Sequence, residues 1–132
     1  MYKYILLFIT VFGASFFAFS QTEVDPNGYN VFYYPNGEKS AEGNFLNGKP
    51  EGFWKNYFEN GVLKSEGNRV NHELDSIWLF YYENGLLKEK VNYAQSKKNG
   101  FSYEYSEEGF LLAQYPYEND TIQGMANLFL PA

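Results

Sequence analysis

The sequence has 132 residues, which is enough for one modest domain. It contains no cysteine, so disulfides, thiolate metal sites and a lipidated N-terminal cysteine are excluded. The net charge of −6 comes from residues of both signs interspersed along the chain without a basic stripe, which argues against a nucleic-acid surface and against attachment to anionic lipid.

Residues 1–20 have the pattern of a secretory signal peptide. Lys3 gives a short basic start, the run from Tyr4 to Phe17 is almost wholly apolar, and small residues precede a cleavage site near Ser20/Gln21. The run is too short to span a bilayer, although a retained anchor is the alternative interpretation. The pattern therefore predicts an exported protein, periplasmic or secreted, with residues 21–27 as the lead-in to the fold.

A repeat of 24 residues governs the rest of the chain. Three sets of residues recur in register: the turn glycines Gly37, Gly61, Gly85 and Gly109; the unit starts Gly28, Gly52, Ser76, Gly100 and Gly124; and the aromatic set Tyr33, Tyr57, Tyr81, Tyr105 and Phe129. The sequence thus predicts four units, at 28–51, 52–75, 76–99 and 100–123. Residues 124–132 are expected to form a partial fifth repeat or a capping strand.

Each unit reads as strand, turn, strand, turn, which is clearest between Gly52 and Asp75. The β-favouring run 53–58 is followed by Asn60-Gly61, a dipeptide suited to a two-residue type I′ hairpin turn, and the chain returns over 62–70. Asn71-His72 then closes the unit. Such units predict a continuous antiparallel meander in a single layer, stabilised by contacts between neighbouring units.

Alternation along the first strand of each unit separates two faces. One face is large and apolar or aromatic in every copy, so we expect it to be the structural core. Its members are Tyr29, Tyr33, Phe53, Tyr57, Ile77, Tyr81, Phe101, Tyr105, Met125 and Phe129.

Aromatic residues on the other face are concentrated in the middle units, which favours an exposed binding patch. The proposed patch consists of Tyr34, Trp54, Phe58, Trp78 and Tyr82. The alternative is that both faces are packed, with the curled sheet or a second chain covering these rings. Gly43 and Gly67 lie mid-strand in one column, where glycine lets a bulky aromatic side chain lie against the backbone.

The units resemble MORN (membrane occupation and recognition nexus) repeats, in the bacterial variant found in YwqK-type proteins. The resemblance rests on segments such as 52–67, with Gly52-Phe53-Trp54 and Glu59-Asn60-Gly61, and it extends from Gly28 to Gly124. It implies an all-β fold in which tandem 24-residue β-hairpin repeats form an elongated, twisted single-layer antiparallel meander. It further implies a scaffold for protein or membrane contacts, and YwqK-type proteins are labelled as antitoxins.

No enzyme, metal site or cofactor is predicted. The only histidine, His72, occupies a turn position and reads as a solvated surface residue, and the column of Glu59, Glu83 and Glu107 is explained by the repeat alone. The predicted function is a non-catalytic protein-binding scaffold, with antitoxin- or immunity-like neutralisation of a toxin as one form of it. A glycan- or membrane-associated module is the alternative, and edge-to-edge self-association is a further prediction.

Overall fold

The computed structural model describes residues 23–130, and these residues form strands and turns without a helix. The predicted signal peptide, residues 1–20, lies outside the described residues, as do residues 21–22 of the predicted lead-in and residues 131–132. Over the described part of the chain, there is accordingly no helix of the length and apolar character needed to cross a membrane.

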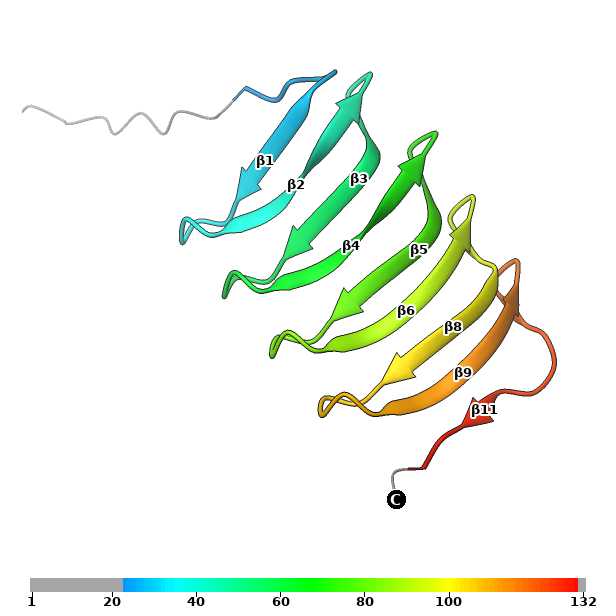
Figure 1. Ribbon diagram of the computed structural model, residues 1–132. Coiled ribbons are helices and arrows are strands. Elements are labelled where there is room, and N and C mark those ends of the chain that lie inside the picture. The colour runs from blue at the N-terminus through cyan, green and yellow to red at the C-terminus, as the bar shows by residue number, and fades with distance from the viewer. Residues whose placement is uncertain (1–22, 131–132) are drawn as a thin grey trace, which may run out of the picture.

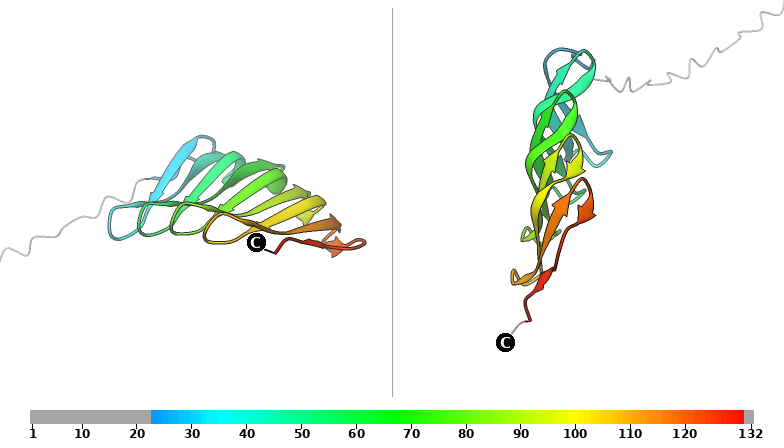
Figure 2. Two further views of the ribbon diagram at one scale, coloured as in Figure 1. Left: turned by 60° about the horizontal axis from the view of Figure 1, so that its bottom comes forward. Right: turned by 90° about the vertical axis from the view of Figure 1, so that its right-hand side faces the viewer.

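Eleven antiparallel strands form one sheet in which strand order follows chain order (Figure 1). The strands are β1 (Tyr29–Tyr33), β2 (Lys39–Leu46), β3 (Lys49–Tyr57), β4 (Leu63–Val70), β5 (Glu73–Tyr81), β6 (Leu87–Ala94), β7 (Lys97–Lys98), β8 (Gly100–Tyr105), β9 (Leu111–Glu118), β10 (Thr121–Ile122) and β11 (Asn127–Leu128). Strands β7 and β8 both pair with β6, and β10 and β11 both pair with β9. Figure 2 shows the sheet as one elongated, twisted layer, which confirms the predicted fold class.

The turns at the lower left of Figure 1, which we call the glycine-turn edge, each contain one left-handed glycine. In the second unit, Gly61 N–H donates to the Phe58 carbonyl at 2.9 Å, Phe58 N–H donates to the Val62 carbonyl at 2.8 Å, and only Gly61 has positive φ. This is a type I turn followed by a glycine bulge, so the type I′ prediction for Asn60-Gly61 is wrong. Three residues separate Phe58 from Val62. A hairpin loop of three residues adopts a type I turn with a bulge, whereas a type I′ turn needs a loop of two residues.

The opposite edge carries the two-residue type I′ turns. Both central residues have positive φ in all four of them, namely Asn47-Gly48, Asn71-His72, Gln95-Ser96 and Asn119-Asp120. A type I′ turn needs two left-handed residues, and asparagine tolerates that conformation better than most side chains do. Tight turns at one edge and bulged turns at the other therefore alternate along the chain. Within the strand pairs the register shifts at bulges, such as the one between Gly43 and Asn44, and the equivalent shift recurs in the next unit between Glu66 and Asn68.

The core is a single line of residues across one face of the sheet, in which large side chains alternate with small ones. Trp54 is paired with Gly43 and Gly67, and Trp78 is paired with Val91. A Cβ atom on Gly43 would collide with the Trp54 ring, and one on Gly67 would collide with the Trp78 ring. Each indole thus lies directly against the backbone of the preceding strand.

The tryptophans also hold that strand through their polar ends. Trp54 Nε1–H donates to the Asn44 carbonyl at 2.9 Å, and Trp78 Nε1–H donates to the Asn68 carbonyl at 2.8 Å. Only 6% of Trp54 and 3% of Trp78 is exposed. Since a buried indole N–H without a partner would be costly, the two hydrogen bonds allow both rings to be buried on a sheet with no second layer.

At the equivalent positions of the next unit, Val91 and Ser102 replace the glycine and the tryptophan, and both are buried. The pattern predicts that the two positions compensate each other in volume. Gly67→Val alone should lower the free energy of unfolding by about 1–3 kcal/mol, because the new side chain collides with the Trp78 ring. Gly67→Val/Trp78→Ser should lose less than the two single changes together, with a coupling of about 0.5–3 kcal/mol in urea unfolding. If the loss in the double variant equals the sum of the losses in the two single variants, the contact between residue 67 and the Trp78 ring is contradicted.

Candidate functional site

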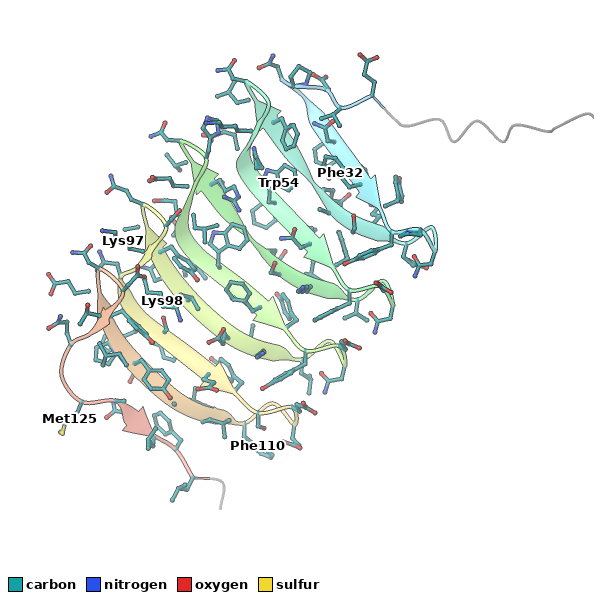
Figure 3. The ribbon with its side chains drawn as sticks, turned by 180° about the vertical axis from the view of Figure 1, so that it is seen from behind. Phe32, Trp54, Lys97, Lys98, Phe110 and Met125 are labelled. Carbon is teal, nitrogen blue, oxygen red and sulfur yellow. The ribbon has the colours of Figure 1, made fainter. Side chains whose placement is uncertain are left out.

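Two members of the predicted patch, Trp54 and Trp78, lie in the core, so the prediction that they are exposed is wrong. Phe45 stacks on Trp54 with ring centroids 5.4 Å apart, and Phe32 lies 6.4 Å from the same ring. The Arg69 guanidinium lies 5.5 Å from the Trp78 ring. Figure 3 shows Trp54 beside Phe32 near the N-terminal end of the sheet. The residues of this face therefore cover one another.

The other three members, Tyr34, Phe58 and Tyr82, are half-buried at the glycine-turn edge and join successive turns. Tyr34 Oη–H donates to the Tyr57 carbonyl at 2.7 Å, and Tyr82 Oη–H donates to the Tyr105 carbonyl at 2.8 Å. Phe58 occupies the equivalent position in the second unit and lacks the hydroxyl. The junction between the second and third turns is therefore built without this hydrogen bond.

Two open grooves along this edge bring the same three residues together. One, of about 500 Å³, is lined by Phe58, Tyr81, Tyr82, Glu83, Asn84, Lys88 and Glu107, and the other, of about 460 Å³, by Tyr34, Phe58, Glu59, Asn60, Lys64 and Glu83. Lys64 and Lys88 each place an ammonium group 5.6 Å from the centre of an aromatic ring, Phe58 and Tyr82 respectively. The grooves therefore present aromatic rings already paired with cations, beside a row of carboxylates.

The face predicted to be the core is the more exposed one, so that prediction is wrong. One side chain from each of the four units forms a line across it, which we call the apolar row. Its members and their exposed fractions are Tyr29 58%, Phe53 52%, Ile77 47% and Phe101 53%. Tyr33, Met125 and Phe129 of the predicted core are exposed as well, and Met125 lies between β10 and β11 rather than in a strand. Phe53 and Ile77 directly precede Trp54 and Trp78, and Tyr29 and Phe101 directly precede the buried Asn30 and Ser102, so the row lies on the opposite face to the tryptophans.

On the exposed face, further along the strands from the apolar row, tyrosines donate hydrogen bonds to glutamates of the preceding strand. Tyr57 Oη–H donates to Glu42, and Tyr81 Oη–H donates to Glu66 at 2.8 Å. Lys39 Nζ lies 2.8 Å from Glu42, and the hydrogen bonds from Lys39 and Tyr57 lower the pKa of the Glu42 carboxyl group. Burial, followed by the bond to Glu66, raises the pKa of Tyr81 to about 12. Both tyrosines are therefore half-buried structural residues, whereas Tyr33 and Phe129 of the same predicted column are exposed.

His72 is a constrained turn residue rather than a freely solvated one. It has a φ of 68°, its N–H donates to Glu51 Oε2 at 2.7 Å, and its Nδ1 lies 3.2 Å from the Pro50 carbonyl oxygen. These contacts bind the turn to the start of β3. Between residues 23 and 130, histidine and acidic side chains form no group of three or more that could hold a metal ion.

Fold and surface together define a class: a single-layer repeat protein of tandem β-hairpins, with one face packed and the other lined by exposed apolar side chains. The sequence profile of the MORN repeat variant matches residues 25–47, 50–71 and 74–95, and the chain belongs to this family. MORN repeats are commonly non-catalytic binding modules. The predicted fourth unit follows the matched segments and folds as the hairpin of β8 and β9. A search of curated proteins found no matching sequence.

The missing hydroxyl at Phe58 leads to a stability prediction. Phe58→Tyr should supply the hydrogen bond that Tyr34 and Tyr82 make at the neighbouring junctions, and raise the free energy of unfolding by about 0.5–1.5 kcal/mol. Tyr82→Phe is the matched reverse change and should lower it by a similar amount. Thermal unfolding of both variants measures the effect. An unchanged melting temperature for Phe58→Tyr, together with a lowered one for Tyr82→Phe, would mean that the second junction has a different geometry.

Proposed function

We propose that the protein is a non-catalytic scaffold that binds a protein partner through the apolar row. The observation that supports this proposal most directly is the alignment of Tyr29, Phe53, Ile77 and Phe101 on the open face. Single exposed apolar residues are ordinary, but an unbroken series of them, one from each unit, is typical of an interaction surface. The packed tryptophan face makes the sheet stable without the partner.

The shape of the surface favours a macromolecular partner over a small molecule. Small-molecule sites are concave and surround most of the ligand, whereas the row runs across an open sheet. Its aromatic members are of the kind that supply much of the binding energy in protein interfaces. The sheet backbone is already paired, so the exposed side chains provide the contact.

We further propose that the protein is exported after cleavage near Ser20/Gln21 and works in the periplasm or outside the cell. The support is the pattern of residues 1–20 in the sequence. In that compartment an antitoxin- or immunity-like role would mean covering a toxin that arrives in, or passes through, the cell envelope. Protein expressed from the full sequence should be recovered from the exported fraction with the mass of residues 21–132. Recovery of the uncleaved chain in the membrane fraction would contradict export by cleavage.

The proposal predicts that capture of a partner depends on the row and not on exposed apolar surface in general. Phe53→Ser/Phe101→Ser removes two members of the row. Phe110→Ser is the matched control, because Phe110 is 59% exposed and lies at the glycine-turn edge, away from the row (Figure 3). With cell-envelope extract, the wild type and Phe110→Ser should retain the same stoichiometric protein, and the double variant should lose it while keeping its melting temperature.

Two results would overturn this function. If the wild type and both variants capture the protein equally, the row is not part of the contact surface. Strong co-sedimentation of the wild type with peptidoglycan or liposomes, in the absence of any captured protein, would establish the glycan- or membrane-associated alternative.

A further inference from the structure

The apolar row has a regular spacing, and that spacing limits what can lie along it. Its members come from alternate strands, and neighbouring strands are about 4.8 Å apart, so consecutive members are separated by about 9.6 Å. The three intervals from Tyr29 to Phe101 therefore cover about 29 Å. A partner that contacts every member with one face needs side chains at the same interval.

Of the regular backbone conformations, polyproline II matches this interval best. It has three residues per turn and a rise of about 3.1 Å, so one side of it presents a side chain about every 9.3 Å, and nine residues cover about 28 Å. An α-helix presents equivalent side chains every seventh residue, or about 10.5 Å, and three such intervals cover about 32 Å. Over the length of the row, the helix would therefore be out of register by about 3 Å and polyproline II by about 1 Å.

The residues between the row members point to the same kind of occupant. Asn44 is paired with Tyr29, Asn68 with Phe53, and Asn92 with Ile77, so these side chains lie on the same face as the row. Asn92 donates its amide to the Asn99 carbonyl at 2.6 Å. Asn44 is exposed and Asn68 half-buried, which leaves their amides within reach of a bound chain.

Asparagine amides beside two of the apolar side chains, Tyr29 and Phe53, suit a chain with free backbone carbonyls. Polyproline II has no internal hydrogen bonds, so its carbonyls can accept hydrogen bonds from a binding surface. The carbonyls of an α-helix are used within the helix, and those of a second copy of this sheet are paired with neighbouring strands. Two carboxylates beside the row have partners within the protein, because Glu42 accepts hydrogen bonds from Lys39 and Tyr57, and Glu66 accepts one from Tyr81. The proposed recognition therefore uses apolar contact and amide hydrogen bonds.

We propose that the apolar row binds an extended, proline-rich segment of the partner in the polyproline II conformation, with an apolar side chain at every third residue. The segment lies across the strands, each apolar side chain sits against one member of the row, and the amides of Asn44 and Asn68 donate to its carbonyls. This inference rests on the proposed function, and it specifies the chemical character of the partner.

Synthetic peptides of about 15 residues, long enough to span the row, provide the test. The main probe repeats Leu-Pro-Pro. The first control repeats Ser-Pro-Pro, which keeps the conformation and removes the apolar contacts. The second repeats Leu-Pro-Pro-Pro, which keeps the composition and breaks the interval. A third, helical peptide of alanine, glutamate and lysine carries leucine at every seventh position. The binding of each peptide to the protein, expressed from the full sequence and purified from the host, is measured by isothermal titration calorimetry.

The Leu-Pro-Pro peptide is expected to bind, and all three control peptides to bind about tenfold more weakly or not at all. Phe53→Ser/Phe101→Ser should weaken the binding of the Leu-Pro-Pro peptide about tenfold, and Phe110→Ser should leave it unchanged. Asn44→Ala/Asn68→Ala should weaken it by a smaller factor and keep the melting temperature of the wild type.

Failure of the inference can be distinguished from failure of the proposed function. Binding of the helical peptide in preference to Leu-Pro-Pro, with loss in Phe53→Ser/Phe101→Ser, would keep the row as the contact surface and overturn the polyproline II partner. A dimer in analytical ultracentrifugation that dissociates in the same double variant would assign the row to a second copy. If no peptide binds, and if Phe53→Ser/Phe101→Ser captures the same protein as the wild type, both proposals are overturned.

Discussion

The structure depends on the contact between each tryptophan and the glycine of the strand before it. A sheet of one layer has no second sheet or helix against which to bury side chains, so it must form its core from neighbours within the layer. Trp54 and Trp78 solve this problem by lying flat on Gly43 and Gly67, and their N–H groups bond to the carbonyls of Asn44 and Asn68. Each contact joins one hairpin unit to the next. Stability therefore accumulates along the array, as in other repeat proteins.

The same solution leaves the opposite face free. Because the core is built on one side, the apolar residues that alternate with the tryptophans are not needed for packing and remain about half exposed. Tyr57 and Tyr81 stiffen this open face through their bonds to Glu42 and Glu66, and the turns at both edges hold the strands in register. A preorganised surface reduces the entropic cost of association. The proposed scaffold function rests on this difference between the packed face and the open face.

Much of this fold could be predicted from the sequence, because the period of 24 residues and the turn glycines define the hairpins directly. The identity of the buried face could not be predicted from alternation, since both faces carry aromatic residues. The residues that are apolar in every unit do not form the core. The buried residues occupy a position that changes from one unit to the next, from Trp78 to Ser102. The sequence does contain one signal of the buried face, which is that side-chain sizes at two repeat positions compensate each other. Gly67 occurs with Trp78, and at the equivalent positions of the next unit Val91 occurs with Ser102. Recognition of that covariation requires the strand register, which the sequence does not state.

Hydroxyl-radical footprinting of the folded protein tests the central claim most directly, because it reports which face of the single layer is accessible in solution. Indole is intrinsically among the most reactive side chains, so protection of a tryptophan is a clear sign of burial. Trp54 and Trp78 are expected to oxidise slowly, and Phe53, Phe101 and Met125 to oxidise at rates close to those in the unfolded chain. Fast oxidation of both tryptophans with protection of the apolar row would show that the core lies on the other face.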